Sequence, residues 1–252
     1  LRSLPRRHRD DAARPTMTVL RSRAVQLLFW AWTALLAVLY LPLLALPRRA
    51  IVVAGRAWAE SVLWLLARLV RLRHRIEGLE HVPSGPAIWA LKHQSAWDTL
   101  VVPILVPDPV VILKQELLWL PFYGWYATRH GMIGIDRGGA AKALRAMVAA
   151  ARRAADAGHS IVVFPEGTRT APGTHRPYHS GIAALYGQLD LPVVPVALNS
   201  GLFWGRRAFT RRPGTITLRI LPPIPPGLDR REFMTRLEDT IESATEDLVA
   251  HP

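Results

Sequence analysis

The sequence predicts an α/β fold, preceded by a pair of membrane-anchoring helices. Three observations lead to this prediction: a run of twenty almost wholly apolar residues near the N-terminus, short apolar segments alternating with helical stretches from Ile76 onwards, and a helix-period apolar pattern at the C-terminal end. Alternating strand and helix patterns are typical of α/β domains. The length agrees, because 252 residues are enough for one domain with a substantial core and an appendage.

The N-terminal apolar run is long enough to span a membrane. Residues 1–16 are rich in arginine and show no periodic pattern, so we expect a disordered leader that ends before Met17. Residues 27–46 are apolar apart from Thr33 and Pro42. A helix of this length measures about 30 Å, the thickness of a hydrocarbon core. A cleaved signal peptide would have a shorter apolar region and a small-residue cleavage site, which the segment lacks.

A second apolar stretch, 51–70, carries Arg56, Glu60 and Arg68 on one helical face and is therefore amphipathic. A single span would leave one of the flanking arginine clusters on the wrong side under the positive-inside rule, whereas a hairpin must bring the arginines of its turn to lipid headgroups. We therefore expect a membrane-anchoring helix pair over 17–75, of undecided depth. The α/β domain, 76–252, is expected on the cytoplasmic side of the inner membrane.

The composition points to an anionic partner. The net charge is +13, from 32 basic against 19 acidic residues, and both nucleic acid and an anionic membrane surface suit that charge. Half of the residues are apolar and nine are Trp, whereas a compact nucleic-acid module seldom carries a long uncharged run. Membrane lipids are therefore favoured over nucleic acid. The lack of Cys excludes disulfides, thiolate metal ligands and a Cys nucleophile.

Six short apolar runs are the expected strands: 87–91, 110–113, 132–135, 160–164, 193–198 and 216–220. The fifth run contains Pro195 and follows Pro192, which excludes a regular central strand and suggests an edge strand or a wall for an acyl chain; a core wall is the alternative. Residues 140–157 have high helix propensity and should form a crossover helix. The last helix should begin at the N-cap Asp229 and present an acidic outer face. Its acidic residues are Glu238, Asp239, Glu242, Glu246 and Asp247.

A candidate catalytic pair follows the first of these strands, where His93 and Asp98 stand five residues apart. On a regular helix this offset is about 140° of rotation, so the two side chains would not share a face. Across a strand-to-helix turn they can meet. Asp98 would then accept the Nδ1 proton of His93 and leave Nε2 as a base toward a hydroxyl. A histidine that caps the following helix is the alternative.

Two further strands end in an arginine. The third runs into Ile-Asp-Arg at 135–137, before a helix N-terminus whose backbone N–H groups attract anions. The fourth runs into Phe-Pro-Glu-Gly-Thr-Arg at 164–169, where the glycine permits close approach and the guanidinium suits a phosphate. Ligands of open α/β sheets gather at strand ends. The alternative at both places is an ion pair between the acidic residue and the arginine of the same turn.

Taken in order, His-x-x-x-x-Asp, Gly-x-x-x-Ile-Asp-Arg, Phe-Pro-Glu-Gly-Thr-Arg and a Val-Pro-Val segment resemble the motifs of the glycerolipid acyltransferases. The similarity is greatest to the bacterial 1-acylglycerol-3-phosphate acyltransferases (lysophosphatidic acid acyltransferases), and it covers 92–198. It implies a mixed sheet and acyl transfer from acyl-CoA or acyl-carrier protein to lysophosphatidic acid, giving phosphatidic acid. It also implies that His93 and Asp98 are catalytic, without a metal or resident cofactor. The implied substrate-binding residues are Arg137, Glu166, Gly167, Thr168 and Arg169.

Within this interpretation, Arg137 and Arg169 hold the acceptor phosphate, and Glu166 orients Arg169 or the acceptor. Two departures from the family pattern concern the acceptor. Tyr178-His179 stands where family members often carry Phe-Lys, and Lys92 stands where Asn or another polar residue is common. The first departure removes or weakens one cation.

Several alternatives stay open. The acceptor is either lysophosphatidic acid or another lyso-lipid, such as a lyso-ornithine lipid or a different lysophospholipid. A lipid or thioester hydrolase would use the same base on water, and a non-catalytic membrane scaffold would explain the apolar N-terminal region alone. Ser95 lacks the Gly-x-Ser-x-Gly elbow expected of an acyl-enzyme nucleophile. A basic cluster either docks an acidic carrier protein or anionic lipid or forms a solvated loop. It consists of Arg206, Arg207, Arg211 and Arg212.

Overall fold

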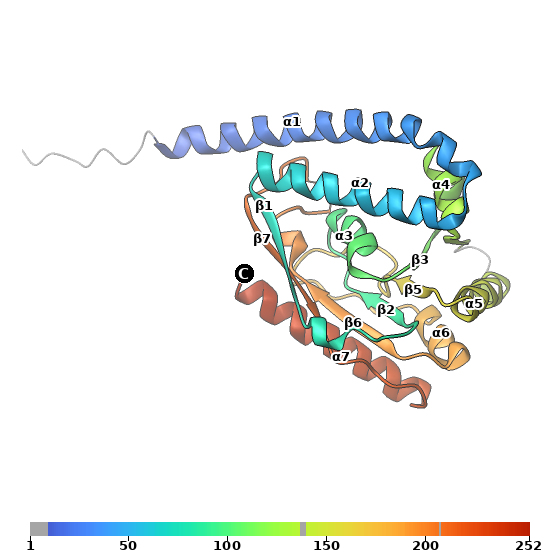
Figure 1. Ribbon diagram of the computed structural model, residues 1–252. Helices are drawn as coiled ribbons and strands as arrows, with labels where there is room; N and C mark the ends of the chain where they lie inside the picture. Colours follow the sequence, from blue (N-terminus) through green and yellow to red (C-terminus); the bar gives the residue numbers. More distant parts are fainter. Residues whose placement is uncertain (1–9, 137–139, 207) are drawn as a thin grey trace, which may run out of the picture.

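A seven-stranded sheet lies at the centre of the computed structural model, which describes residues 10–136, 140–206 and 208–252 (Figure 1). The strands are β1 (Leu72–Glu77), β2 (Ile88–Leu91), β3 (Pro109–Lys114), β4 (Ile133–Ile135), β5 (Ser160–Val163), β6 (Val193–Leu198) and β7 (Gly214–Ile220). Their order is β1-β7-β6-β2-β5-β3-β4. Neighbours pair in parallel except β6 and β7, which are antiparallel. The α/β fold with a mixed sheet is thus confirmed.

All six expected strands are present, and β1 is an additional one. Only Leu72 of β1 is buried, while Arg73, His74 and Arg75 are exposed, so the segment carries no apolar period that would indicate a strand. It forms the sheet edge and pairs in parallel with β7. Residues 72–75, which the sequence analysis grouped with the anchoring helices, are thus part of the sheet and not of a helix.

β6 is a central, fully buried strand between β7 and β2, so the expectation that its prolines exclude a central position is wrong. Pro195 falls where the ladder on the β7 side is irregular. Val193 pairs with Ile224, and Val196 pairs with Ile220, so three residue steps on β6 face four on the other segment. Proline is tolerated at such a bulge, because its missing N–H interrupts no regular ladder.

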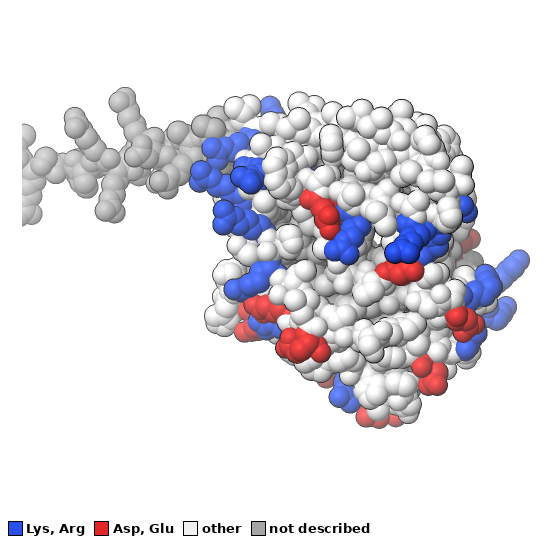
Figure 2. Space-filling model, in the orientation of Figure 1, with Lys and Arg blue, Asp and Glu red and all other residues white. Residues whose placement is uncertain are grey.

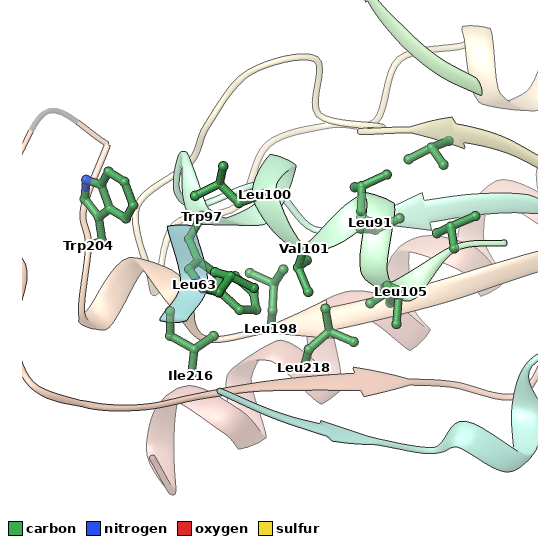
Figure 3. Close-up of a cluster of buried hydrophobic side chains, with 14 of the residues drawn as sticks. Leu63, Leu91, Trp97, Leu100, Val101, Leu105, Leu198, Trp204, Ile216 and Leu218 are labelled. Atoms are coloured by element: carbon green, nitrogen blue, oxygen red, sulfur yellow. The ribbon is translucent and has the colours of Figure 1, made fainter. Parts of the chain in front are cut away.

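Helices bury a separate core on each face of the sheet. On one face, α2 (Arg48–Leu69) and α3 (Trp97–Leu105) pack over the strands, and Leu63, Trp97 and Leu218 belong to the same buried cluster (Figure 3). The other face is covered by α5 (Ala140–Asp156), α6 (Gly181–Leu189) and α7 (Arg230–Ala250). α5 is the predicted crossover helix. β2, β5, β3 and β4 are parallel neighbours, so their carboxyl ends lie along the same edge of the sheet. Ligand sites of α/β folds form at this kind of edge.

The last helix begins as predicted. The side chain of Asp229 accepts hydrogen bonds from the backbone N–H groups of Arg231 and Glu232, which satisfies two donors of the first turn. α7 buries Phe233, Leu237 and Ile241 against the sheet. It packs along β6.

The N-terminal segment forms a helical hairpin of α1 (Asp10–Leu39), the short 3₁₀ turn η1 (Leu41–Ala45) and α2, laid across the first core (Figure 1). α1 already begins within the segment expected to be a leader; residues 1–9 lie outside the described part of the chain. Residues 19–39 and 48–69 are each long and apolar enough to cross a membrane. One face of α2 belongs to the first core, so α2 lies along the α/β domain, and its predicted amphipathic character is confirmed.

The outer side of the hairpin is apolar and exposed. Its exposed large apolar side chains include Leu20, Leu27, Leu28, Trp30, Trp32, Leu35, Val38 and Leu39. Figure 2 shows a largely uncharged surface over α1, whereas Lys and Arg gather near the beginning of α1 and beside β1. Such a patch, bordered by cations, suits a lipid surface.

Candidate active site

His93 and Asp98 meet across the turn between β2 and α3. Nδ1 of His93 lies 2.9 Å from Oδ2 of Asp98, and the same oxygen accepts hydrogen bonds from the backbone N–H groups of Gln94 (2.7 Å) and Ser95 (2.8 Å). The other oxygen accepts from the hydroxyl of Ser200 at 2.5 Å. Asp98 is fully buried, whereas the side chain of His93 keeps 14% exposure. The carboxylate is thus fixed by four donors, and Nε2 is the imidazole nitrogen left for chemistry.

The segment after β5 holds His93 from three sides. Oε2 of Glu166 accepts the backbone N–H of His93 at 2.9 Å, and the backbone N–H of Thr170 donates to the carbonyl of His93 at 2.8 Å. The ring of Phe164 stacks on the imidazole, with 4.2 Å between centroids. These contacts are possible because β2 and β5 are parallel neighbours, so their carboxyl ends lie side by side.

Glu166 takes a different place from the one expected. It is buried, and its Oε1 accepts from Nζ of Lys92 at 2.8 Å and from the hydroxyl of Thr170. Arg169 instead points a guanidinium nitrogen toward the carbonyl of Arg206, 3.5 Å away. The expected orientation of Arg169 by Glu166, and the alternative ion pair between them, are therefore both wrong: Glu166 supports the His93 peptide from behind.

The acidic outer face expected on α7 also needs a correction. Glu242 points inward, where its two carboxylate oxygens lie 2.7 and 2.8 Å from Nζ of Lys92. The hydroxyl of Tyr178 donates to the same carboxylate at 2.7 Å. Lys92 is 1% exposed, and a lysine so deeply buried requires carboxylate partners. Glu242 follows the buried Ile241 and lies at the margin of the apolar face of α7. Its partner Lys92 is 150 residues away, so the sequence around Glu242 does not predict this contact.

A large cavity opens beside His93, between the hairpin and the sheet. Its volume is about 1310 Å³, and its walls come from both hairpin helices, α3, β3, α5, η3 (Gln115–Trp119) and α4 (Tyr123–His130). The lining is mainly apolar. Several of the residues that share the wall with His93 come after the carboxyl ends of parallel strands: Lys114, Asp136, Gly167, Thr168, Arg169, His179 and Arg206. Arg137 lies outside the described residues. Lys114 and Arg206 are two further cations in this wall.

The hairpin is fastened to the domain beneath its turn. Nε of Arg48 donates to the carbonyl of His130 at 2.6 Å, and its guanidinium pairs with Asp108. Oδ2 of Asp108 also lies 2.7 Å from Nδ1 of His159. His130 is buried in the cavity wall, where desolvation, followed by the charge of Arg48, lowers its pKa to about 4. The His130 side chain therefore stays uncharged near neutral pH.

The basic cluster in the segment between β6 and β7 is not uniformly solvated. Arg211 is 2% exposed, its guanidinium lies 4.2 Å above the ring of Trp204, and it donates to Gln26 of α1 at 2.6 Å. The solvated-loop interpretation is therefore wrong for Arg211, which ties the loop to the hairpin. Arg206 lines the cavity, and Arg207 lies outside the described residues.

Comparisons with known proteins agree with this geometry. The acyltransferase family model matches residues 73–199. A 1-acyl-sn-glycerol-3-phosphate acyltransferase of Pseudomonas aeruginosa is 33% identical over 165 residues, which are 66% of this chain and 64% of that protein. The human 1-acyl-sn-glycerol-3-phosphate acyltransferase alpha is 32% identical over 197 residues, 77% of this chain and 69% of the relative. The crystal structure of PlsC from Thermotoga maritima superposes with a TM-score of 0.73 at 20% identity, covering 95% of this chain and 98% of that one.

The low pKa of His130 predicts a pH-dependent stability. Between about pH 6.5 and 4 the unfolded chain binds a proton at this residue and the folded chain does not, so the free energy of unfolding falls as the pH decreases. From pH 7 to pH 5 the loss is roughly 2 kcal/mol. We expect His130→Gln to reduce the difference between the melting temperatures measured at pH 7 and pH 5. An equal pH dependence in wild type and His130→Gln would contradict the assignment.

Proposed function

Because the chain belongs to the acyltransferase family, we propose that it transfers a fatty acyl group from acyl-CoA or acyl-carrier protein to the free hydroxyl of 1-acylglycerol-3-phosphate, giving phosphatidic acid. The observation that carries the proposal is the His93–Asp98 pair, whose imidazole lines a large, mainly apolar cavity. The names of the relatives support the acceptor. The aligned part of the chain spans 64% of the length of the Pseudomonas relative. The identities of the acyl acceptor and the acyl donor are therefore part of our proposal.

In the proposed reaction, Nε2 of His93 removes the proton of the acceptor hydroxyl while its oxygen attacks the thioester carbonyl. The new C–O bond forms, the C–S bond breaks, and the departing thiolate takes the proton from the imidazolium. Asp98 holds the Nδ1 proton and stabilises the imidazolium charge. General-base catalysis of this kind accelerates a reaction by about 10²- to 10⁴-fold. The steps use no metal and no resident cofactor.

The cavity supports a division of the substrates into an apolar and an anionic part. An acyl chain fits the apolar walls between the hairpin and the sheet, with its thioester at His93. The acceptor phosphate lies at the strand ends, where Arg169 offers a planar guanidinium and Gly167 and Thr168 offer close approach. Lys114 and Arg206 add positive charge there, which offsets the weaker cation at His179.

The hairpin supports membrane association of the enzyme. Its exposed apolar side would lie in the lipid, and the basic side chains near the beginning of α1 would meet anionic headgroups. The cavity is lined by both hairpin helices, so a lipid substrate would reach His93 without leaving the bilayer interface. We place the α/β domain on the cytoplasmic side of the inner membrane, where both acyl donors are made available.

Transfer of radiolabelled acyl groups by the purified protein tests the proposed activity directly. A panel of lyso-lipids, each offered with acyl-CoA and with acyl-carrier protein, should show preferred incorporation into lysophosphatidic acid. His93→Ala should reduce turnover by at least about 10²-fold, because the base is removed. Preference for a lyso-lipid without a terminal phosphate would assign another acceptor class, and release of free fatty acid without any acceptor would indicate a hydrolase.

Arg169→Ala tests the phosphate site. Loss of a charge-assisted hydrogen bond costs about 1.5 to 3 kcal/mol, so the KM for lysophosphatidic acid should rise by about 10- to 100-fold while the KM for the acyl donor stays the same. Arg176→Ala is the matched control, since Arg176 is exposed and lies outside the cavity lining described here. A rise confined to the KM of the donor would show that Arg169 binds the donor.

A further inference from the structure

Lys92 connects the catalytic turn to the C-terminal helix through two carboxylates. Its Nζ lies 2.8 Å from Glu166 and 2.7 and 2.8 Å from the two oxygens of Glu242. Lys92 and Glu166 are buried, and the side chain of Glu242 is 14% exposed. Glu242 stands 150 residues after Lys92 in the sequence, so the contact depends on the packing of α7 against the sheet.

Every carboxylate oxygen of this group has a donor. Oε1 of Glu166 accepts hydrogen bonds from Nζ of Lys92 and the hydroxyl of Thr170, and Oε2 accepts one from the backbone N–H of His93. Glu242 receives Lys92 on both oxygens and the hydroxyl of Tyr178 on Oε1. Burial, followed by the charge of Glu242, raises the pKa of Tyr178, so its hydroxyl remains a donor. A fully satisfied buried network fixes the geometry of its members.

Two departures from the family pattern meet in this network. Lys92 and Tyr178 both contact the carboxylate of Glu242, although the three residues come from different parts of the chain. Neither they nor Glu242 belong to the described cavity lining. A direct role in substrate binding is therefore not indicated. The network contacts the His93 peptide through Glu166, which accepts the His93 N–H, and through Thr170, which donates to Glu166 and to the His93 carbonyl.

We propose that Lys92 and Glu242 are positioning residues for the acyl transfer. They hold Glu166 in place, and Glu166 holds the His93 peptide so that Nε2 stays aligned with the reacting hydroxyl. This inference rests on the proposed role of His93 as the base. Without Lys92, Glu166 and Glu242 would face each other as buried like charges, which pushes Glu166 away from His93.

Net charge provides the sharpest test. Lys92 with two carboxylates carries −1, Lys92→Met carries −2, and the double variant Lys92→Met/Glu242→Gln returns to −1. A displaced catalytic group lowers kcat, and displacements of about 1 Å cost up to about 100-fold. We expect Lys92→Met to lower kcat by about 10- to 100-fold, with both KM values within about twofold, and the double variant to regain at least about threefold. Glu246→Gln, an exposed change on the same helix, is the control.

The assays are run at a temperature at which the melting curve of each variant shows folded protein. A kcat of Lys92→Met within about twofold of wild type, or a double variant no faster than Lys92→Met, would overturn the proposal. A rise in the acceptor KM at constant kcat would overturn it as well, since the network would then shape the phosphate site. If Lys92→Met does not fold, the single variant Glu242→Gln provides the test. We expect its kcat to fall by about threefold or more at unchanged KM, and an unchanged kcat would overturn the proposal.

His93→Ala in the same assay separates this proposal from the proposed function. Loss of activity in His93→Ala together with wild-type kcat in the network variants would refute the positioning role alone. Wild-type activity in all variants would refute the base and the positioning role together.

Discussion

The short segment after β5 holds the peptide of His93, and the whole candidate site depends on this contact. Glu166 accepts the N–H of His93, Thr170 donates to its carbonyl, and Phe164 stacks on its ring. A histidine on a turn between a strand and a helix would otherwise retain rotational freedom, and a base must stay within hydrogen-bond reach of the proton it removes. The parallel pairing of β2 with β5 makes the contact possible, because it places two segments 73 residues apart at the same sheet edge.

Holding the peptide with a buried carboxylate has consequences for the rest of the chain. The charge of Glu166 requires a cation, which is Lys92, and the buried cation is stabilised further by Glu242 of α7. On the other side, Arg48 ties the hairpin, which forms part of the cavity wall, to Asp108. The turn after β2, the C-terminal helix and the N-terminal hairpin thus all contact or border the candidate site, although they are distant in sequence.

Much of this arrangement could be predicted from the sequence, because it rests on local signals. Apolar runs predicted six strands, Asp229 predicted a helix start, and the spacing of His93 and Asp98 predicted a pair across a turn. The strand β1 was not predicted, because an edge strand with exposed charged residues shows no alternation of apolar residues. The inward position of Glu242 was not predicted, because it depends on how α7 packs against the sheet. The contact of Glu166 with the His93 peptide was not predicted either, because it depends on the order of the strands, which a short segment of sequence does not determine.

The protonation of His93 tests the central claim most directly. If Asp98 holds the Nδ1 proton, the neutral imidazole must carry its hydrogen on Nδ1 and present a bare Nε2 to the cavity. Nitrogen NMR of protein with ¹⁵N-labelled histidine, assigned by the signals that disappear in His93→Gln, distinguishes the two tautomers. The structure predicts a protonated Nδ1 and an unprotonated Nε2 for neutral His93. A neutral ring with its hydrogen on Nε2 would contradict the proposed base.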